Sequence, residues 1–573
     1  MKKKILALLL AAATAVSMAG CGGAASSDTS ADTSASTDTQ TTDTTADSSA
    51  EEETLDWSKY DALIDQIRTD TDFADRVDLM HKAEDMLMST WAVIPIYYYN
   101  DIYMMKSNVS GMYDTVYGIK YFQGAQKEGD TNININLASE PQYVDPALNS
   151  SVDGACLVSN MFSGLYKYDE NSKVVPEIAE DMPEVSDDGT VYTVKLKQTT
   201  WSDGTPVTAK DFVYSWNRVI DEKTAADYAY LFDIVAKNDD GTLKVEAPDD
   251  YTLQVTLTNP CPYFNALMAF PVFYPVPQSS VEAADPDGTT PSKWCQEAGF
   301  ITNGAYTMTA WTHNESMTFT KNPAYFDAAN VKSDTLTFML SEDSTATYAA
   351  YQSGALDMVD EVPTDEIPNV KDSAEFHKED QLGTYYLAFN VNSDLFKDMS
   401  WSDSCKFRHA ISDLIDRQYI IDTVAQTGQV AADSYIPAGM SDGNGGEFKN
   451  KSYYDATPPN VEEAKSLLEE CGYTFTDNGD GTYTPDKDIT LPYITNDAGG
   501  HVKIAECIQS DLSVLGINMD ISKEDWNVFL QDRKDGKFTF AREGWLADYD
   551  DPINMLEMFR SDSGNNDPQF GKQ

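Results

Sequence analysis

Basic residues are scarce in this chain. Its 40 lysines and arginines are outnumbered by 94 aspartates and glutamates, and the formal net charge is −54. Because a surface of that charge repels the phosphates of DNA and RNA, we expect no nucleic-acid partner. The acidity favours solubility and carries no information about the fold.

Short signatures of common enzyme classes are also missing. The sequence contains no GxSxG, no HExxH and no phosphate-binding P-loop. A glycine-containing acidic turn at residues 477–482 lacks the rest of a twelve-residue calcium loop. The histidines do not stand at the spacing of metal ligands: His81, His313, His377, His409 and His501. We therefore predict a protein that is not an enzyme and that uses no metal and no cofactor.

Cysteines are few and widely scattered, without a CxxC pair. Six follow Cys21 in the chain: Cys156, Cys261, Cys295, Cys405, Cys471 and Cys507. An extracellular protein can pair some of them as disulfides, or all six can be buried free thiols. The sequence leaves both possibilities open.

The apolar run at the start of the chain is too short to cross a bilayer as a permanent helix. It covers residues 5–16, follows three lysines, and ends in small residues before Cys21. This pattern resembles a bacterial lipoprotein signal. The resemblance implies that residues 1–20 are a signal peptide and that Cys21 carries lipid. An ordinary secretory signal with a chance cysteine is the alternative.

Residues 21–55 form an acidic Ser/Thr linker. Residues 22–53 contain no lysine, arginine or aromatic residue. Because such a segment cannot bury a core, we expect it to be disordered. As a flexible coil it would reach roughly 30 Å on average. Lipid and linker together would place the folded body outside the cell and close to the membrane.

The remainder of the chain has the composition of a folded body. Aromatic residues make up 11% of the sequence, and a length of 573 residues suggests several domains. Apolar residues at helical spacing predict two helices over residues 55–87. Residues 92–99 predict a buried strand with a proline at its edge. Residues 123–130 are polar and contain glycine, which predicts a linker.

Residues 538–552, FTFAREGWLADYDDP, predict a strand, a loop and the start of a helix. Asp551 before Pro552 is typical of an N-cap followed by proline at the first helical position. Arg542 and Asp548, with Trp545 between them, are suited to hold both ends of a zwitterion. The alternative is a surface loop whose charges are solvated.

Longer stretches resemble, in order, the extracellular solute-binding proteins of oligopeptide and dipeptide ABC importers (solute-binding family 5). The matching segments are residues 139–146, 161–169, 184–221, 262–277, 301–311, 321–328, 351–363, 385–392, 408–421 and 544–552. The resemblance implies a type II periplasmic-binding-protein-like α/β fold. In that fold two lobes close on a ligand by hinge motion, and this family adds a third domain.

The order of the ends implies that the chain is circularly permuted. In the family, the segment resembling GWLADYDDP is followed by helices and a VIPLYYY-like strand. Similar residues stand here at the front, in positions 57–106. The alternative is a rearranged gene, in which the tail of one copy precedes a truncated second copy. The implied domains are lobe 1 at 101–162 and 278–382, the extra domain at 163–277, and lobe 2 at 56–100 and 383–573.

The resemblance also implies which side chains hold the two ends of a ligand. In the family, an aspartate of the WxADY segment holds the amino terminus, and the matching residue here is Asp548. A few cationic side chains meet the carboxylate end, and the matching positions are Arg542, Arg533 and His501. Guanidinium groups suit this role because their paired N–H groups fit a planar carboxylate.

The same family match implies a set of main-chain contacts. Gly544 and Trp545 would offer backbone groups to the peptide, as an added strand does. The facing edge matches Ser150, Ser151 and Val152.

Two tyrosines, Tyr228 and Tyr99, fall on ligand-lining positions of the family. Each is otherwise an ordinary core tyrosine, since the chain has 32. The chain departs from the enteric type of oligopeptide binder at Ala388 and Ala425, which replace an acid and a lysine. Such a departure is consistent with a ligand of different length or kind.

The function implied is that of a substrate-binding lipoprotein that captures extracellular oligopeptides and delivers them to an ABC permease. The expected partners are the oligopeptide, the permease with its ATPase subunits, and the membrane through a lipid anchor. The expected location is the extracellular face of a bacterial cell membrane, and we expect a monomer. The alternatives are a surface receptor for a signalling peptide and a family member that binds a non-peptide solute.

Overall fold

The computed structural model describes residues 56–137, 140–443, 446–497 and 499–572. The predicted signal peptide, Cys21 and the linker lie outside the described residues. Among the helices that are described, none combines the length and the apolar character needed to cross a bilayer. The six cysteines after Cys21 are free thiols, and three of them are buried.

A mixed sheet of eleven strands organises the part of the chain that is described. Its order is β13 (Tyr306–Thr312), β14 (Ser316–Lys321), β15 (Thr335–Met339), β4 (Asn132–Asn136), β16 (Met358–Val359), β1 (Val93–Met105), β17 (Phe376–Phe389), β23 (Phe540–Leu546), β21 (Ile489–Asn496) and β22 (Ile517–Glu524), with β18 (Val430–Ala431) paired to β1. Pairing is parallel for β15–β4, β16–β4, β21–β22 and β21–β23 and antiparallel elsewhere.

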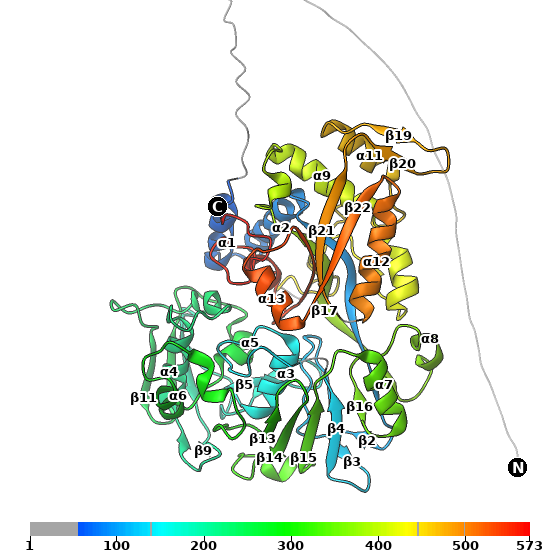
Figure 1. The fold of residues 1–573 in the computed structure, drawn as a ribbon. Helices are drawn as coiled ribbons and strands as arrows, with labels where there is room; N and C mark the ends of the chain where they lie inside the picture. Colours follow the sequence, from blue (N-terminus) through cyan, green and yellow to red (C-terminus); the bar gives the residue numbers. More distant parts are fainter. Residues whose placement is uncertain (1–55, 138–139, 444–445, 498, 573) are drawn as a thin grey trace, which may run out of the picture. The chain divides into compact units, whose positions relative to one another are not determined.

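Two long antiparallel strands, β1 and β17, run through the middle of the molecule. Figure 1 shows β17 between an upper body with β21 and β22 and a lower body with β4 and β13 to β15. The ladder of β1 and β17 has register shifts on either side of Tyr97 and Tyr98. Pro95 adjoins the first of these shifts, where a missing N–H donor is tolerated. The predicted strand at 92–99 is thus confirmed, but it is the start of a longer central strand.

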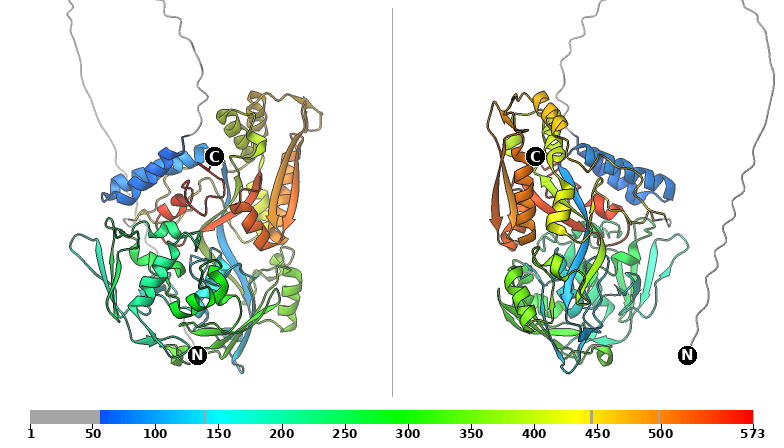
Figure 2. Two further views of the ribbon diagram at one scale, coloured as in Figure 1. Left: turned by 60° about the vertical axis from the view of Figure 1, so that its left-hand side comes forward. Right: turned by 90° about the vertical axis from the view of Figure 1, so that its right-hand side faces the viewer.

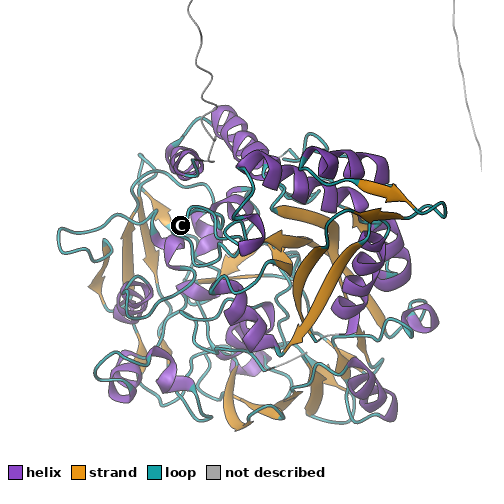
Figure 3. Cartoon of the chain, turned by 45° about the horizontal axis from the view of Figure 1, so that its top comes forward, coloured by secondary structure: helices purple, strands orange, loops and turns teal. Residues whose placement is uncertain are grey.

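Helices flank this sheet on both sides (Figure 3). α12 (Gly499–Ser513) packs on β21 and β22, α13 (Trp526–Lys534) on β21, and α3 (Val152–Met161) on β13. The other helices of the main body are α7 (Ser344–Ser353), α8 (Ile367–Val370), α9 (Trp401–Leu414), α10 (Arg417–Ile420) and α11 (Val461–Glu470). Short turns and hairpins complete it: η3 (Pro291–Cys295), η4 (Ala328–Asn330), η5 (Asp394–Phe396), η6 (Ile421–Ala425), β19 (Phe475–Asp477) and β20 (Tyr483–Pro485).

A separate four-stranded sheet has the order β11 (Val245–Asp249), β12 (Thr252–Thr256), β8 (Val191–Lys195) and β7 (Glu184–Val185). α4 (Ala209–Val219) packs on it and is closed at its start by a Thr208–Asp211 capping box. Neighbouring elements are β5 (Tyr166–Tyr168), β6 (Val174–Pro176), β9 (Thr199–Thr200), β10 (Pro206–Val207), η1 (Ala229–Phe232), α5 (Phe264–Leu267), η2 (Pro271–Phe273) and α6 (Gln278–Ala284).

The two helices predicted over residues 55–87 are confirmed as α1 (Ser58–Thr69) and α2 (Phe73–Ser89). The side chain of Asp72 caps α2 by accepting from the amides of Ala74 and Asp75. Figure 2 shows both helices, in blue, beside the red C-terminal segment. Chain regions almost 500 residues apart therefore share one core.

Buried contacts join these helices to the segment around α14 (Ile553–Glu557). The indole of Trp57 stacks on Phe570 with 4.0 Å between centroids. The hydroxyl of Tyr60 donates to the carbonyl of Leu556 at 2.8 Å. Arg76 donates to both carboxylate oxygens of Asp551, at 2.9 and 2.7 Å. We call this contact surface the terminal interface.

The predicted cap at Asp551 is correct in kind and shifted by one residue. Asp551 accepts from the amide of Ile553 at 3.1 Å, but Pro552 occupies the cap and α14 begins at Ile553. The bidentate pair with Arg76 was not predicted, because its partner lies 475 residues away.

The prediction of a linker at residues 123–130 is wrong. β3 (Gln126–Lys127) pairs with β2 (Val109–Ser110). Ala125 is fully buried, and its carbonyl accepts from Ser333 Oγ at 2.7 Å. Lys127 Nζ lies 3.0 Å from Asp357. The segment is part of the fold because its residues pack against partners far away in the sequence. Polarity and glycine content do not reveal such partners.

Candidate ligand-binding site

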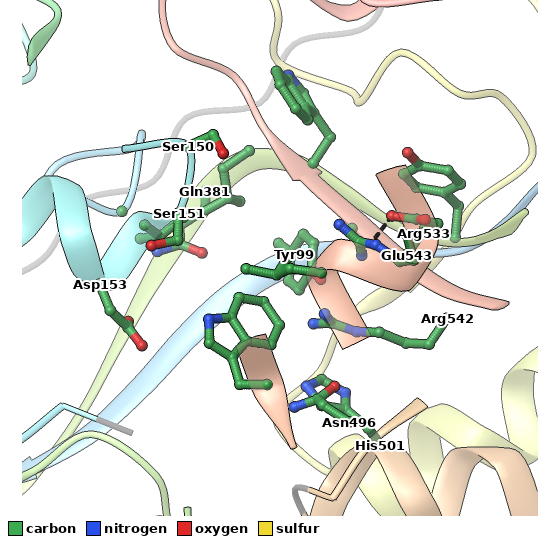
Figure 4. A pocket seen from close by; sticks show the side chains of 18 of the residues that line it. Tyr99, Ser150, Ser151, Asp153, Gln381, Asn496, His501, Arg533, Arg542 and Glu543 are labelled. Carbon is green, nitrogen blue, oxygen red and sulfur yellow. Dashed lines mark ion pairs between the residues drawn. The ribbon is translucent and has the colours of Figure 1, made fainter. Parts of the chain in front are cut away.

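A cavity of about 350 Å³ lies where β1, β23, α13 and the starts of α3 and α12 meet. This volume falls within the range of roughly 300–1,000 Å³ common for small-ligand sites. Figure 4 shows side chains from these elements converging on it. Nine of the predicted residues line it: Tyr99, Ser150, Ser151, Val152, Arg533, Arg542, Gly544, Trp545 and His501.

A smaller cavity of about 80 Å³ adjoins the first. It is lined by Tyr228 and Asp548, the two predicted residues that do not line the larger cavity. The two cavities share Ser150, Gly544 and Trp545 among their lining residues. The whole predicted set therefore lies around two adjoining cavities.

Strand β23 presents an open backbone edge to this region. One side of it pairs with β17 along its whole length. On the other side it pairs with β21 only through Phe540 and Ala541 among the described residues. The N–H and C=O groups between Arg542 and Leu546 are thus without a strand partner there. Such an edge can accept an extended peptide as an additional strand.

Gly544 in this edge has no room for a side chain. A Cβ there would lie 2.2 Å from the hydroxyl oxygen of Tyr99. The glycine therefore allows the Tyr99 ring, from the central strand β1, to pack directly against the backbone of β23.

Arg542 is a cation without a carboxylate partner among the described residues. Its Nε has no hydrogen-bond partner there, and its guanidinium lies 5.5 Å from the ring centroid of Tyr385. Burial lowers the pKa of Arg542, but Tyr99, Tyr385 and Glu543 raise it more, so the net shift is upward. The side chain stays charged, and its guanidinium, which already interacts with the hydroxyls of Tyr99 and Tyr385, can also donate to a carboxylate.

Arg533 differs from Arg542 because its charge is already matched. It lies 2.7 Å from Glu543 and 3.2 Å from Asp567, and all three side chains are largely buried. Figure 4 shows the pair with Glu543 as a dashed line. Arg533 therefore lines the cavity as the centre of an internal ion-pair cluster.

His501, near the start of α12, is a neutral donor or acceptor. Burial, with a smaller effect of Arg542, holds the pKa of its imidazole well below the usual value. Its Nδ1 has no hydrogen-bond partner among the described residues. It can offer a hydrogen bond to a ligand but not a full positive charge.

Asp548 is 7% exposed and has only neutral hydrogen-bond donors in the part of the chain that is described. Its oxygens accept from the hydroxyl of Tyr228 at 3.1 Å and from Asn554 Nδ2 at 2.9 Å. Burial raises the pKa of the carboxyl to about 7, although both hydrogen bonds oppose that shift. An arriving ammonium would stabilise the ionised form.

Two residues of this site escaped prediction. Asn554 orients Asp548 by accepting from its amide at 2.9 Å while donating to its carboxylate. Lys534, from α13, donates to Ser150 Oγ at 2.9 Å and to Asp227, so that it links α13 to the Ser150 side of the cavity. Nothing in the local sequence marks either residue, because their partners belong to other elements.

Known proteins resemble this chain along most of its length. Residues 173–567 match the model of bacterial extracellular solute-binding proteins, family 5 Middle. The periplasmic oligopeptide-binding protein OppA of Salmonella typhimurium is 33% identical over 468 residues, which cover 78% of this chain and 80% of the relative. The oligopeptide-binding protein OppA of Bacillus subtilis is 32% identical over 471 residues, covering 78% and 81%.

A solved structure is similar as well. Listeria monocytogenes OppA bound to peptide superimposes with a TM-score of 0.69 at 29% identity, covering 77% of this chain and 86% of that one. The class defined by fold and site is thus a two-lobed, type II periplasmic binding protein. The chain belongs to the bacterial extracellular solute-binding proteins of family 5.

Proposed function

We propose that this protein captures extracellular oligopeptides in the two adjoining cavities and delivers them to the permease of an ABC importer. The observation that carries the proposal is the open edge of β23. Beside this edge lie the carboxyl of Asp548 and the guanidinium of Arg542, neither of which has an ion-pair partner among the described residues. The names of the relatives, which are oligopeptide-binding proteins, support the same assignment.

In the proposed complex, Asp548 holds the ammonium group of the peptide and Arg542 holds its carboxylate. The β23 edge bonds to the peptide backbone, with Ser150, Ser151 and Val152 facing it. Tyr228 keeps Asp548 in place through the 3.1 Å hydrogen bond, and Tyr99 supports the backbone at Gly544. Each charged end would then exchange water for one charge-assisted partner.

The location and the domain plan are part of the same proposal. Residues 1–20 would be removed, Cys21 would carry lipid, and the protein would act as a monomer on the outer face of the membrane. Lobe 1 would comprise 101–162 and 278–382, the extra domain 163–277, and lobe 2 56–100 and 383–573. The implied hinge then coincides with β1 and β17, which pass between the two bodies.

We also propose that the chain is a circular permutant of its family. The terminal interface supports this, because α1, α2 and β1 share a core with the segment around α14. If the chain is a permutant, the residues that correspond to Phe570 and Trp57 are joined by continuous chain in the other members of the family. The packed β2–β3 pair would then stand at the join.

Mass spectrometry of the ligands that co-purify with residues 22–573 tests the function. We expect short peptides, released on denaturation, in wild-type protein and far fewer in Asp548→Asn. A sugar or a metal chelate in their place would contradict the proposal.

A further inference from the structure

One wall of the larger cavity is built from carboxylates. Asp101, Asp153, Asp360 and Glu361 all line it. Lys120 lies among them, 2.6 Å from Asp101 and 2.9 Å from Asp360. One ammonium therefore compensates part of a larger negative charge. We call these four side chains the acidic wall.

Asp153 and Glu361 are the members of the wall without a cation of their own. Neither side chain makes a hydrogen bond or ion pair with the described residues, and Lys120 and Arg542 influence Asp153 and Glu361, respectively, without direct contact. Burial raises the pKa of each carboxyl to about 7, and neighbouring carboxylates add to this rise. Figure 4 shows Asp153, from the first turn of α3, facing the cavity.

A second, independent feature points to a ligand with hydrogen-bond donors. Asn496, at the end of β21, lines the same cavity and is 5% exposed. Its Oδ1 has no hydrogen-bond partner among the residues described. Because buried amide oxygens are usually hydrogen-bonded, this oxygen is available to accept from a donor on a ligand. An ammonium or guanidinium group carries several donors and no acceptor.

Apolar residues line the cavity beside Asp153. A Cβ on Gly118 would lie 2.7 Å from Leu546 Cδ1 and 3.1 Å from Val152 Cγ1, so these three residues meet. Val152 directly precedes Asp153. Lysine and arginine side chains commonly lay an aliphatic stem against such an apolar surface and place their cationic tip at neighbouring carboxylates.

Two other occupants fit less well. The described histidines, cysteines and carboxylates form no group of three or more that could hold a metal ion. A peptide with neutral side chains would use only the charges at Asp548 and Arg542, which leaves Asp153 and Glu361 uncompensated.

We propose that the acidic wall binds a lysine or arginine side chain of the ligand, so that the protein selects cationic peptides. This inference rests on the proposed peptide-binding function and adds the class of peptide. Asp153 and Glu361 provide the charge, and Val152 with Leu546 contacts the stem.

A defined peptide library tests the proposal with the full residues 22–573, freed of co-purified ligand. The library contains alanine tri-, tetra- and pentapeptides that carry one lysine, norleucine or glutamate at each position in turn. Captured peptides are quantified by mass spectrometry. At one position or more, we expect lysine peptides to be captured about tenfold over their norleucine counterparts. Glutamate peptides at that position should be depleted.

Two double variants complete the test. In D153N/E361Q, the ratio of lysine to norleucine peptides should fall towards one. In D380N/E297Q, which removes the same charge from side chains that are 88% and 82% exposed, the ratio should stay as in wild type.

Equal capture of lysine and norleucine peptides by wild-type protein overturns the inference, and this comparison does not depend on how the variants fold. A lysine preference that persists in a folded D153N/E361Q also overturns it. Capture of peptides without any charge preference leaves the proposed function standing, whereas capture of none of the library contradicts that function itself.

Discussion

The cavity and the terminal interface both contain charged side chains, and they differ in whether those charges are paired. At the terminal interface the buried charges are paired: Arg76 with Asp551 and Arg68 with Glu557. In the cavity, Arg542, Asp548, Asp153 and Glu361 have no oppositely charged partner within hydrogen-bond distance among the described residues. Burying an unpaired charge costs free energy that a ligand can return. The contrast therefore separates residues that hold the fold together from residues that await a ligand.

The largest expected effect follows from breaking a pair at the terminal interface. Arg76→Met leaves Asp551 buried and uncompensated, because both side chains are almost fully buried. We expect the free energy of unfolding to fall by about 3–5 kcal/mol, measured by denaturant titration of residues 22–573.

Two controls sharpen this result. Adding Asp551→Asn to Arg76→Met should recover much of the loss, since neither charge then remains. Lys210→Met breaks an exposed pair with Asp250 and should leave the unfolding midpoint unchanged. An equal effect of Arg76→Met and Lys210→Met would show that the terminal interface is not structural.

In contrast to Arg76→Met, Asp548→Asn should impair ligand binding and not stability. We expect it to weaken peptide binding by about a hundredfold or more, because it removes the carboxylate that meets the ammonium. The stability of the ligand-free protein should not fall, since a buried carboxyl with a raised pKa does not favour folding. Titration calorimetry and thermal unfolding of the same samples measure both quantities. A destabilised variant that still binds peptide would assign Asp548 to the fold.

Arg542→Met should weaken binding by about tenfold to a hundredfold, since charge-assisted bonds to the peptide carboxylate are lost. Arg542→Lys should recover only part of this, because an ammonium lacks the planar fork. The matched comparison is Arg533→Met, whose charge is held by Glu543 and Asp567. That variant should lose stability first, as judged by its melting temperature.

The smallest expected effect is a dependence of affinity on pH. Burial raises the pKa of Asp548 in the folded protein to about 7 from the ordinary aspartate value of 3.8. Between these values the folded state binds more protons, so the Asp548 contribution to stability falls as pH rises. Binding of an ammonium requires the ionised carboxylate. Affinity for an uncharged-side-chain peptide should therefore rise severalfold between pH 6 and 7.5, and Asp548→Asn should abolish most of this rise.

Local patterns predicted local structure well. Apolar spacing located α1 and α2, and the pattern of residues 538–552 located the strand β23. The motif match assembled eleven residues around the two cavities. Whether each contacts a ligand stays a prediction.

Long-range partners were not predictable from the sequence. Nothing near Asp551 indicates Arg76, and nothing near Arg533 indicates that Glu543 and Asp567 compensate its charge. The segment at 123–130 is polar, yet its pairing with β2 orders it. The tertiary arrangement decides which charged side chains lack a partner. It therefore also decides which charges stabilise the fold and which can bind a ligand.

The central claim is that the unpaired charges of the cavity hold the two ends of a peptide. Its most direct test is calorimetric binding of one recovered peptide in free, N-acetylated and C-amidated forms to wild type, Asp548→Asn and Arg542→Met. We predict that acetylation weakens binding to wild type by about a hundredfold and has little further effect in Asp548→Asn, and that amidation behaves likewise with Arg542→Met. Equal affinity of the free and blocked peptides for wild type would contradict the claim.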